Sequence, residues 1–223
     1  MKNIVKLFDI IALVAVIGFS MAACGDEGNG GGTIDGSTIS SGTQVNYPEK
    51  TPAEAKSQTD FSYIINKEGG VNVVYPLSNF INPNEPASVK ITNSKLDIKL
   101  GTPKSEHLFS IGNNSEDWVG VTITPFDAKV FMVDDESGFF TSNGNYQLYC
   151  IQNELNSASL IYADKAVTIK TVNEYNKTVI FDVSLQKGWN YLIETRVGIT
   201  SKFTSSETLP GGFKWTVGSK KPL

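Results

Sequence analysis

The sequence predicts an all-β protein, a single antiparallel β-sandwich with Greek-key-like connections, and three observations favour it. After residue 60, about a dozen short runs rich in Val, Ile, Thr, Phe and Tyr alternate with clusters of Gly, Asn, Asp and Pro, the pattern of sandwiches and barrels. No window in this region keeps a helical period. Residues 59–218, roughly 160 in all, suffice to bury one core. A closed β-barrel is the architectural alternative.

The first 23 residues have the layout of a secretory signal. Lys2 and Lys6 give a positive start, an almost wholly apolar stretch covers 10–19, and small residues follow. A spanning helix needs about 20 mostly apolar residues, and this stretch is shorter. We therefore predict a signal peptide over residues 1–23.

The signal ends in Met21-Ala22-Ala23-Cys24, which resembles the lipobox of bacterial lipoproteins. The resemblance implies cleavage before Cys24, a thioether lipid on its sulfur, and an acyl chain such as palmitate on the new amino group. It implies an exported protein anchored in a membrane of the cell envelope, facing the periplasm or displayed at the cell surface. The motif departs from the family in having Met21 where Leu is usual and Asp9 close to the apolar stretch.

Residues 24–58 are predicted to be a flexible tether. Their first half is dominated by Gly, Ser and Thr, a composition that buries too little apolar surface to offset its ordering entropy. Thr51 followed by Pro52 is typical of a helix start, so one short helix is expected there. Residues 219–223, with Lys220 and Lys221, are predicted to be a solvated tail.

The folded body begins with two predicted strand pairs. Runs at 61–65 and 71–75 flank a turn that contains Gly69 and Gly70, and a Pro- and Asn-rich loop covers 77–86. The runs at 89–92 and 96–100 alternate apolar with polar residues. Further strands are predicted at 107–111, 118–123, 129–133, 146–151, 158–162, 166–170, 178–185, 189–197 and 213–217.

The clearest strand pattern lies at 178–185, where alternation puts Val179, Phe181 and Val183 on one face. A turn at 186–188 then leads into a returning strand at 189–194. The segment 184–190, together with 160–164 and 167–169, resembles uncharacterised secreted β-sandwich lipoproteins. That resemblance implies fold and location, and no activity is attached to it.

Charge and composition exclude several functions. The formal charge of the chain is −4, and removal of a signal with net charge +1 leaves −5. Nucleic acid is therefore not an expected partner, because phosphate binding needs clustered Lys and Arg. Cys24 and Cys150 are the only cysteines. With Cys24 lipidated, no disulfide framework is possible, and Cys150 is expected to be a buried strand residue.

No catalytic residue, metal site or cofactor is predicted. His107 is the only histidine, so a typical zinc site is not possible. The acidic run Asp134-Asp135-Glu136 lacks the ligand spacing of a calcium loop. No Gly-x-Ser-x-Gly motif marks a nucleophile. A carboxylate-dependent hydrolase remains the enzyme alternative, since a carboxylate pair leaves no signature in sequence.

Aromatic residues are the remaining indication of function. Phe139 and Phe140 stand in an expected loop and, with Trp118, are candidate ligand-binding residues, because exposed aromatic side chains can mark recognition. The alternative is that they fill the core. The sequence thus favours a non-catalytic binding or interaction module for an unknown protein or carbohydrate ligand. A structural or assembly component of the envelope is the other possibility.

Overall fold

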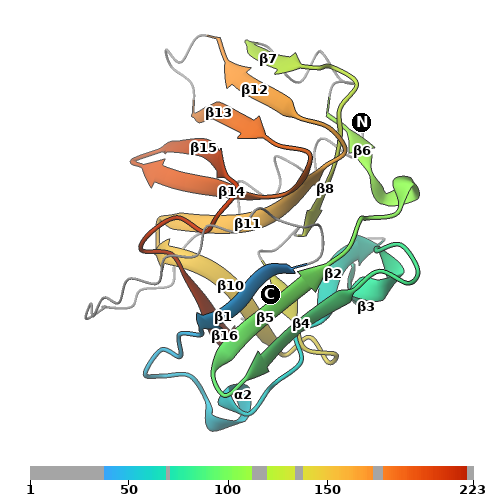
Figure 1. Ribbon diagram of the computed structural model, residues 1–223. Coiled ribbons are helices and arrows are strands. Elements are labelled where there is room, and N and C mark those ends of the chain that lie inside the picture. Colours follow the sequence, from blue (N-terminus) through green and yellow to red (C-terminus); the bar gives the residue numbers. More distant parts are fainter. Residues whose placement is uncertain (1–37, 69–70, 112–119, 134–137, 173–177, 220–223) are drawn as a thin grey trace.

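The computed structural model describes residues 38–68, 71–111, 120–133, 138–172 and 178–219, and most of them belong to β-strands (Figure 1). The helical elements of this part are one turn of α-helix, α2 (Ala53–Lys56), and the 3₁₀ turns η1 (Leu77–Asn79) and η2 (Ser105–His107). The strands are β1 (Thr38–Gln44), β2 (Tyr63–Glu68), β3 (Val71–Pro76), β4 (Ala87–Thr92), β5 (Lys95–Leu100), β6 (Phe109–Ser110), β7 (Val121–Thr124), β8 (Lys129–Val133), β9 (Phe139–Phe140), β10 (Tyr146–Asn153), β11 (Asn156–Ala163), β12 (Val167–Thr171), β13 (Val179–Leu185), β14 (Gly188–Val197), β15 (Thr200–Ser206) and β16 (Lys214–Ser219).

The strands form two sheets in the described part of the chain. A three-stranded antiparallel sheet has the order β1-β5-β4. A thirteen-stranded sheet follows the path β3-β2-β9-β10-β11-β14-β15-β13-β12-β7, with β16 beside β10, and β8 and β6 beside β11. Its two end strands, β3 and β7, do not pair with each other, so the sheet is open.

The large sheet divides at β11. One edge of β11 pairs with β14 along its whole length, whereas the other edge pairs first with β10 and then, from Leu160 to Ala163, with β8. The strands β8, β11 and β14 therefore form a central layer. In Figure 1 this layer crosses the middle of the molecule, with β12 and β13 above it and β4 and β5 below it.

Both faces of the central layer are buried, each in its own hydrophobic cluster. Because strand side chains alternate between faces, Leu160 and Tyr162 pack into the cluster shared with the three-stranded sheet, and Ile161 and Ala163 pack into the other. The second cluster is closed over by β12, β13 and β15, which continue the large sheet and fold back over it. The result is the predicted all-β, sandwich-like fold rather than a closed barrel.

The strand order separates two strands that are consecutive in the chain. The run 178–197 forms β13 and β14 as predicted, but β15 lies between these two strands. It pairs antiparallel with β14 and parallel with β13, from Val179 opposite Ser201 to Asp182 opposite Thr204. The predicted turn after β13 is present, but the sequence Thr200–Ser206 is too polar to have predicted the strand that separates β13 from β14.

The expected tether is too long at its C-terminal end. β1 pairs with β5 from Thr38 to Gln44, and the side chains of Val45 and Ala55 are buried. Residues from Thr38 on therefore already belong to the folded body, which was expected to start near residue 59. β1 escaped prediction because backbone hydrogen bonds hold it and its Ser, Thr and Gly residues carry no apolar signal. The short helix after Pro52 is present as α2.

Candidate functional site

The two phenylalanines predicted to contact a ligand are interior residues. Phe139 and Phe140 form β9, and their exposed fractions are 0% and 2%. They belong to a strand instead of the expected loop, and the ring of Phe139 packs 5.9 Å from that of Trp215. Since exposure was the basis of the ligand-binding prediction for these two residues, the structure removes that basis. Trp118, Cys24 and the acidic run 134–136 lie outside the described residues.

Other aromatic residues of the predicted strands are also buried or half-buried. Tyr146, Trp189 and Trp215 are buried, and Tyr149 is half-buried on the same strand as Tyr146. Trp189 packs edge-on against Tyr162 and Phe131. Recognition by an exposed aromatic face therefore has no support among these residues.

Exposed aliphatic residues gather elsewhere. Four residues form what we call the turn cluster: Leu155, Val172, Val197 and Ile199, with exposed fractions of 57%, 71%, 78% and 87%. They come from three separate connections, namely β10–β11, β12–β13 and β14–β15. The sequence does not mark these four residues as a site, because isolated aliphatic residues at turns resemble ordinary strand ends.

Strand register brings the turn cluster to one end of the molecule. The backbone N–H of Arg196 donates to the carbonyl of Leu155 at 3.1 Å, so the β10–β11 turn adjoins the end of β14. β13 runs parallel to β15, so both start at this end, and β12 finishes there because it is antiparallel to β13. Figure 1 shows the β10–β11 and β14–β15 turns on the left side. Phe126, also exposed, follows β7 at the opposite end.

Local hydrogen bonds fix two of these turns. The side-chain oxygen of Asn153 accepts the N–H of Leu155 at 2.9 Å, which shapes the β10–β11 turn. The two-residue turn between Val197 and Thr200 starts with Gly198 at φ +61°, a left-handed conformation that suits glycine in such hairpins. Both turns present their aliphatic residue to solvent.

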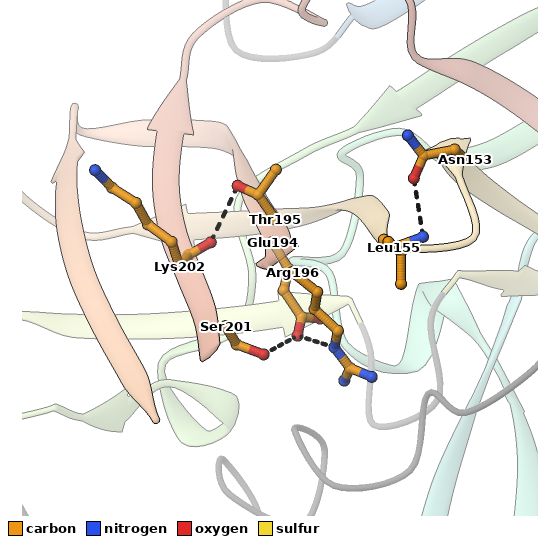
Figure 2. Close-up of polar contacts among 7 residues, drawn as sticks. All are labelled: Asn153, Leu155, Glu194, Thr195, Arg196, Ser201 and Lys202. Atoms are coloured by element: carbon orange, nitrogen blue, oxygen red, sulfur yellow. Dashed lines mark hydrogen bonds and ion pairs between the residues drawn. The ribbon is translucent and has the colours of Figure 1, made fainter. Parts of the chain in front are cut away.

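A charged pair lies directly behind the turn cluster (Figure 2). Glu194 and Arg196 are two residues apart on β14, and therefore on one face. The carboxylate Oε1 of Glu194 accepts hydrogen bonds from Arg196 Nε at 2.8 Å and from Ser201 Oγ at 2.7 Å. The side chains of Arg196 and Glu194 are only 20% and 12% exposed. Arg196 is the only arginine in the sequence. Its guanidinium, the strongest hydrogen-bond donor near the cluster, is bound to the carboxylate of Glu194.

A second group of polar residues surrounds Tyr162 near the three-stranded sheet. Burial raises the pKa of Tyr162, and the negative charges of Asp164 and Glu85 raise it further. These two carboxylates thus lie near one phenol, but each is bound to backbone: Glu85 accepts the N–H of Thr102, and Asp164 accepts the N–H of Lys129 at 2.9 Å. The Thr102 hydrogen bond lowers the pKa of Glu85, which is opposite to what a general acid needs.

His107 and Cys150, the remaining reactive side chains, are packed against neighbouring residues of the fold. The His107 ring lies 4.8 Å from that of Phe80, and its Nε2 is 3.2 Å from the Asn79 carbonyl. Cys150 is buried in the strand expected for it, and burial raises the pKa of its thiol. Within the described ranges, no three His, Cys, Asp or Glu residues are grouped as a metal site, and none of the helices is long and apolar enough to cross a membrane.

Comparison with protein-family models, with curated proteins and with solved structures found no match for this chain.

Proposed function

We propose that this protein is an exported, lipid-anchored lipoprotein of the cell envelope whose folded body is a non-catalytic binding module. The motif Met21-Ala22-Ala23-Cys24 supports the anchor. Thirteen residues, 25–37, separate Cys24 from Thr38, the first residue of β1. Two or three acyl chains would hold such a body stably at a membrane, where one chain would not.

The observation that carries the binding role is the turn cluster. Soluble proteins bury most of their large aliphatic residues, and contiguous exposed apolar surface marks interaction sites. Here four such residues share one end of the fold, and Leu155, Val197 and Ile199 belong to two adjoining turns whose backbone is fixed by hydrogen bonds. A preformed surface of this kind binds without the cost of ordering loops.

The surroundings of the carboxylates favour binding over hydrolysis. The pKa of Glu85 is lowered by its backbone partner, and the carboxylate of Glu194 is occupied by Arg196 and Ser201. Both groups are held as ion-pair or hydrogen-bond acceptors. The lowered pKa of Glu85 is the opposite of what a proton donor needs.

The anchor is tested by fractionating bacterial cells that produce the wild-type chain or the Cys24→Ser variant. The membranes are washed with high salt and alkaline carbonate, which remove peripheral proteins. The wild-type chain should stay in the washed membranes and Cys24→Ser should be released. Cys150→Ala is the matched control, since it removes the other cysteine and should leave retention unchanged. Retention of Cys24→Ser equal to that of wild type would refute the anchor.

A further inference from the structure

We propose that the turn cluster is a lipid-contacting surface, which inserts Val197 and Ile199, flanked by Leu155 and Val172, into the interface of the membrane that holds the anchor. This inference rests on the proposed anchor, which keeps a bilayer within reach. It specifies that the binding module binds the lipid interface of this membrane.

The chemistry of the cluster fits lipid better than protein. Protein interfaces depend on Trp, Tyr and Arg as anchors, whereas all four residues of the turn cluster are aliphatic. The one arginine nearby is largely covered and bound to Glu194. The cluster residues lie at strand ends and turns that are separate in the chain, an arrangement that suits a deformable, laterally uniform partner.

The turn from Val197 to Thr200 has no charge of its own, and the charges of β14 behind it are paired. The segment Val197-Gly198-Ile199-Thr200 carries no charge. Behind it, Glu194 and Arg196 compensate each other at 2.8 Å, and Ser201 Oγ satisfies the same carboxylate oxygen. A paired and hydrogen-bonded charge is far less costly to desolvate than a lone one. The tip can therefore enter the interface without burying an uncompensated charge from β14.

The segment between Cys24 and Thr38 is long enough for the lipidated cysteine to lie in the bilayer while Val197 and Ile199 touch the same bilayer. Thr38 pairs with Lys99, two residues before Gly101, and the Gly101 carbonyl binds the indole of Trp189 at the start of β14. Thr38 thus lies about one length of β14 away from Val197. The ten residues of β14 span about 33 Å at about 3.3 Å per residue. The thirteen residues 25–37 reach at most about 45 Å, which exceeds that span.

The experiment uses the lipidated full-length product reconstituted in phosphatidylcholine vesicles. An environment-sensitive fluorophore is attached at Ile199→Cys, and at Phe126→Cys as the matched control at the opposite end. Cys24 is consumed by lipid, and Cys150 is buried, so labelling is confined to the introduced residue. We expect a blue shift and several-fold stronger quenching by spin-labelled lipid at 199 than at 126, unchanged between low and high salt, because apolar insertion is not screened.

The outcomes separate the two proposals. A chain that floats with the vesicles while its label at 199 stays in water contradicts the inference and leaves the anchor intact. A label buried at 199 in a Cys24→Ser chain that floats as well as wild type contradicts the anchor and supports insertion. Burial of the label at 199 only in native membranes would assign the cluster to a protein partner. Burial that rises with protein concentration in the absence of lipid would assign it to a second copy of this chain. Either result would overturn the inference.

Discussion

The indole Nε1 of Trp189 donates a 3.0 Å hydrogen bond to the carbonyl oxygen of Gly101, and so joins the central layer to the end of the three-stranded sheet. Both groups are buried. Gly101 is required at this point because an added Cβ would collide with the Cβ of Glu85 and lie 3.1 Å from Ile81 Cγ2. The contact therefore fixes how the two sheets meet over the first hydrophobic cluster.

Trp189→Phe should lower the free energy of unfolding, as measured by urea denaturation. It leaves the Gly101 carbonyl buried without its donor, a loss of about 1–3 kcal/mol beyond the change in ring size. Trp215→Phe is the matched control, because Trp215 is equally buried but its Nε1 has no hydrogen-bond partner in the described part of the chain. Equal losses for the two variants would show that the Trp189 hydrogen bond contributes nothing.

The ion pair behind the turn cluster should stabilise the fold. Arg196→Gln leaves a largely buried Glu194 carboxylate, and we expect a loss of about 1–3 kcal/mol in the free energy of unfolding. Glu194→Gln in the same background should recover part of it, so a double-mutant cycle will report coupling. Lys170→Gln breaks the exposed 3.5 Å pair with Asp182 and should cost less than about 1 kcal/mol. Strict additivity of the two β14 variants would contradict this account.

Stability should depend on the Glu85 carboxylate in mild acid. The N–H of Thr102 lowers the pKa of Glu85 below its ordinary value of 4.5. A group with a lowered folded pKa contributes stability above its unfolded pKa and loses it as the pH falls through the folded pKa. The difference between wild type and Glu85→Gln in urea midpoint should thus be largest near neutral pH and shrink as the pH falls below 4.5. A difference that stays constant over this range would exclude the carboxylate as its cause.

Cys150 should be chemically silent in the folded protein. Its thiol is buried, and burial raises its pKa, so both access and thiolate are lacking. In the Cys24→Ser chain, Ellman's reagent should find no thiol under native conditions and the Cys150 thiol after denaturation. Rapid reaction of the native chain would mean that the first hydrophobic cluster opens readily.

Most of the fold could be predicted from the sequence because apolar alternation marks the buried strands. Phe181 and Val183 alternate along β13, and Trp189 lies near the start of β14. All three are buried in the core, as expected. β1 and β15 were missed because most of their residues are polar, and each contributes one large apolar side chain, Ile39 and Phe203, to a hydrophobic cluster. Without β15, the parallel pairing with β13 could not be foreseen.

The candidate site was less predictable. The aromatic residues were predicted to bind a ligand because large exposed rings can mark recognition. Large rings also fill a hydrophobic core well, and Phe139 is fully buried. Val197 and Ile199 flank a glycine in a turn, and such a pattern gains meaning only when strand register places it beside Leu155. Proximity between two separate turns is a property of the fold that no local pattern in the sequence records.

The most direct test of the account is mass spectrometry of the N-terminal peptide of the protein extracted from bacterial membranes. We expect a chain that begins at Cys24, with a diacylglyceryl group on the sulfur and an acyl chain on the amino group. A membrane-extracted chain that still carries residues 1–23, or that begins elsewhere with an unmodified Cys24, would contradict the proposed lipoprotein.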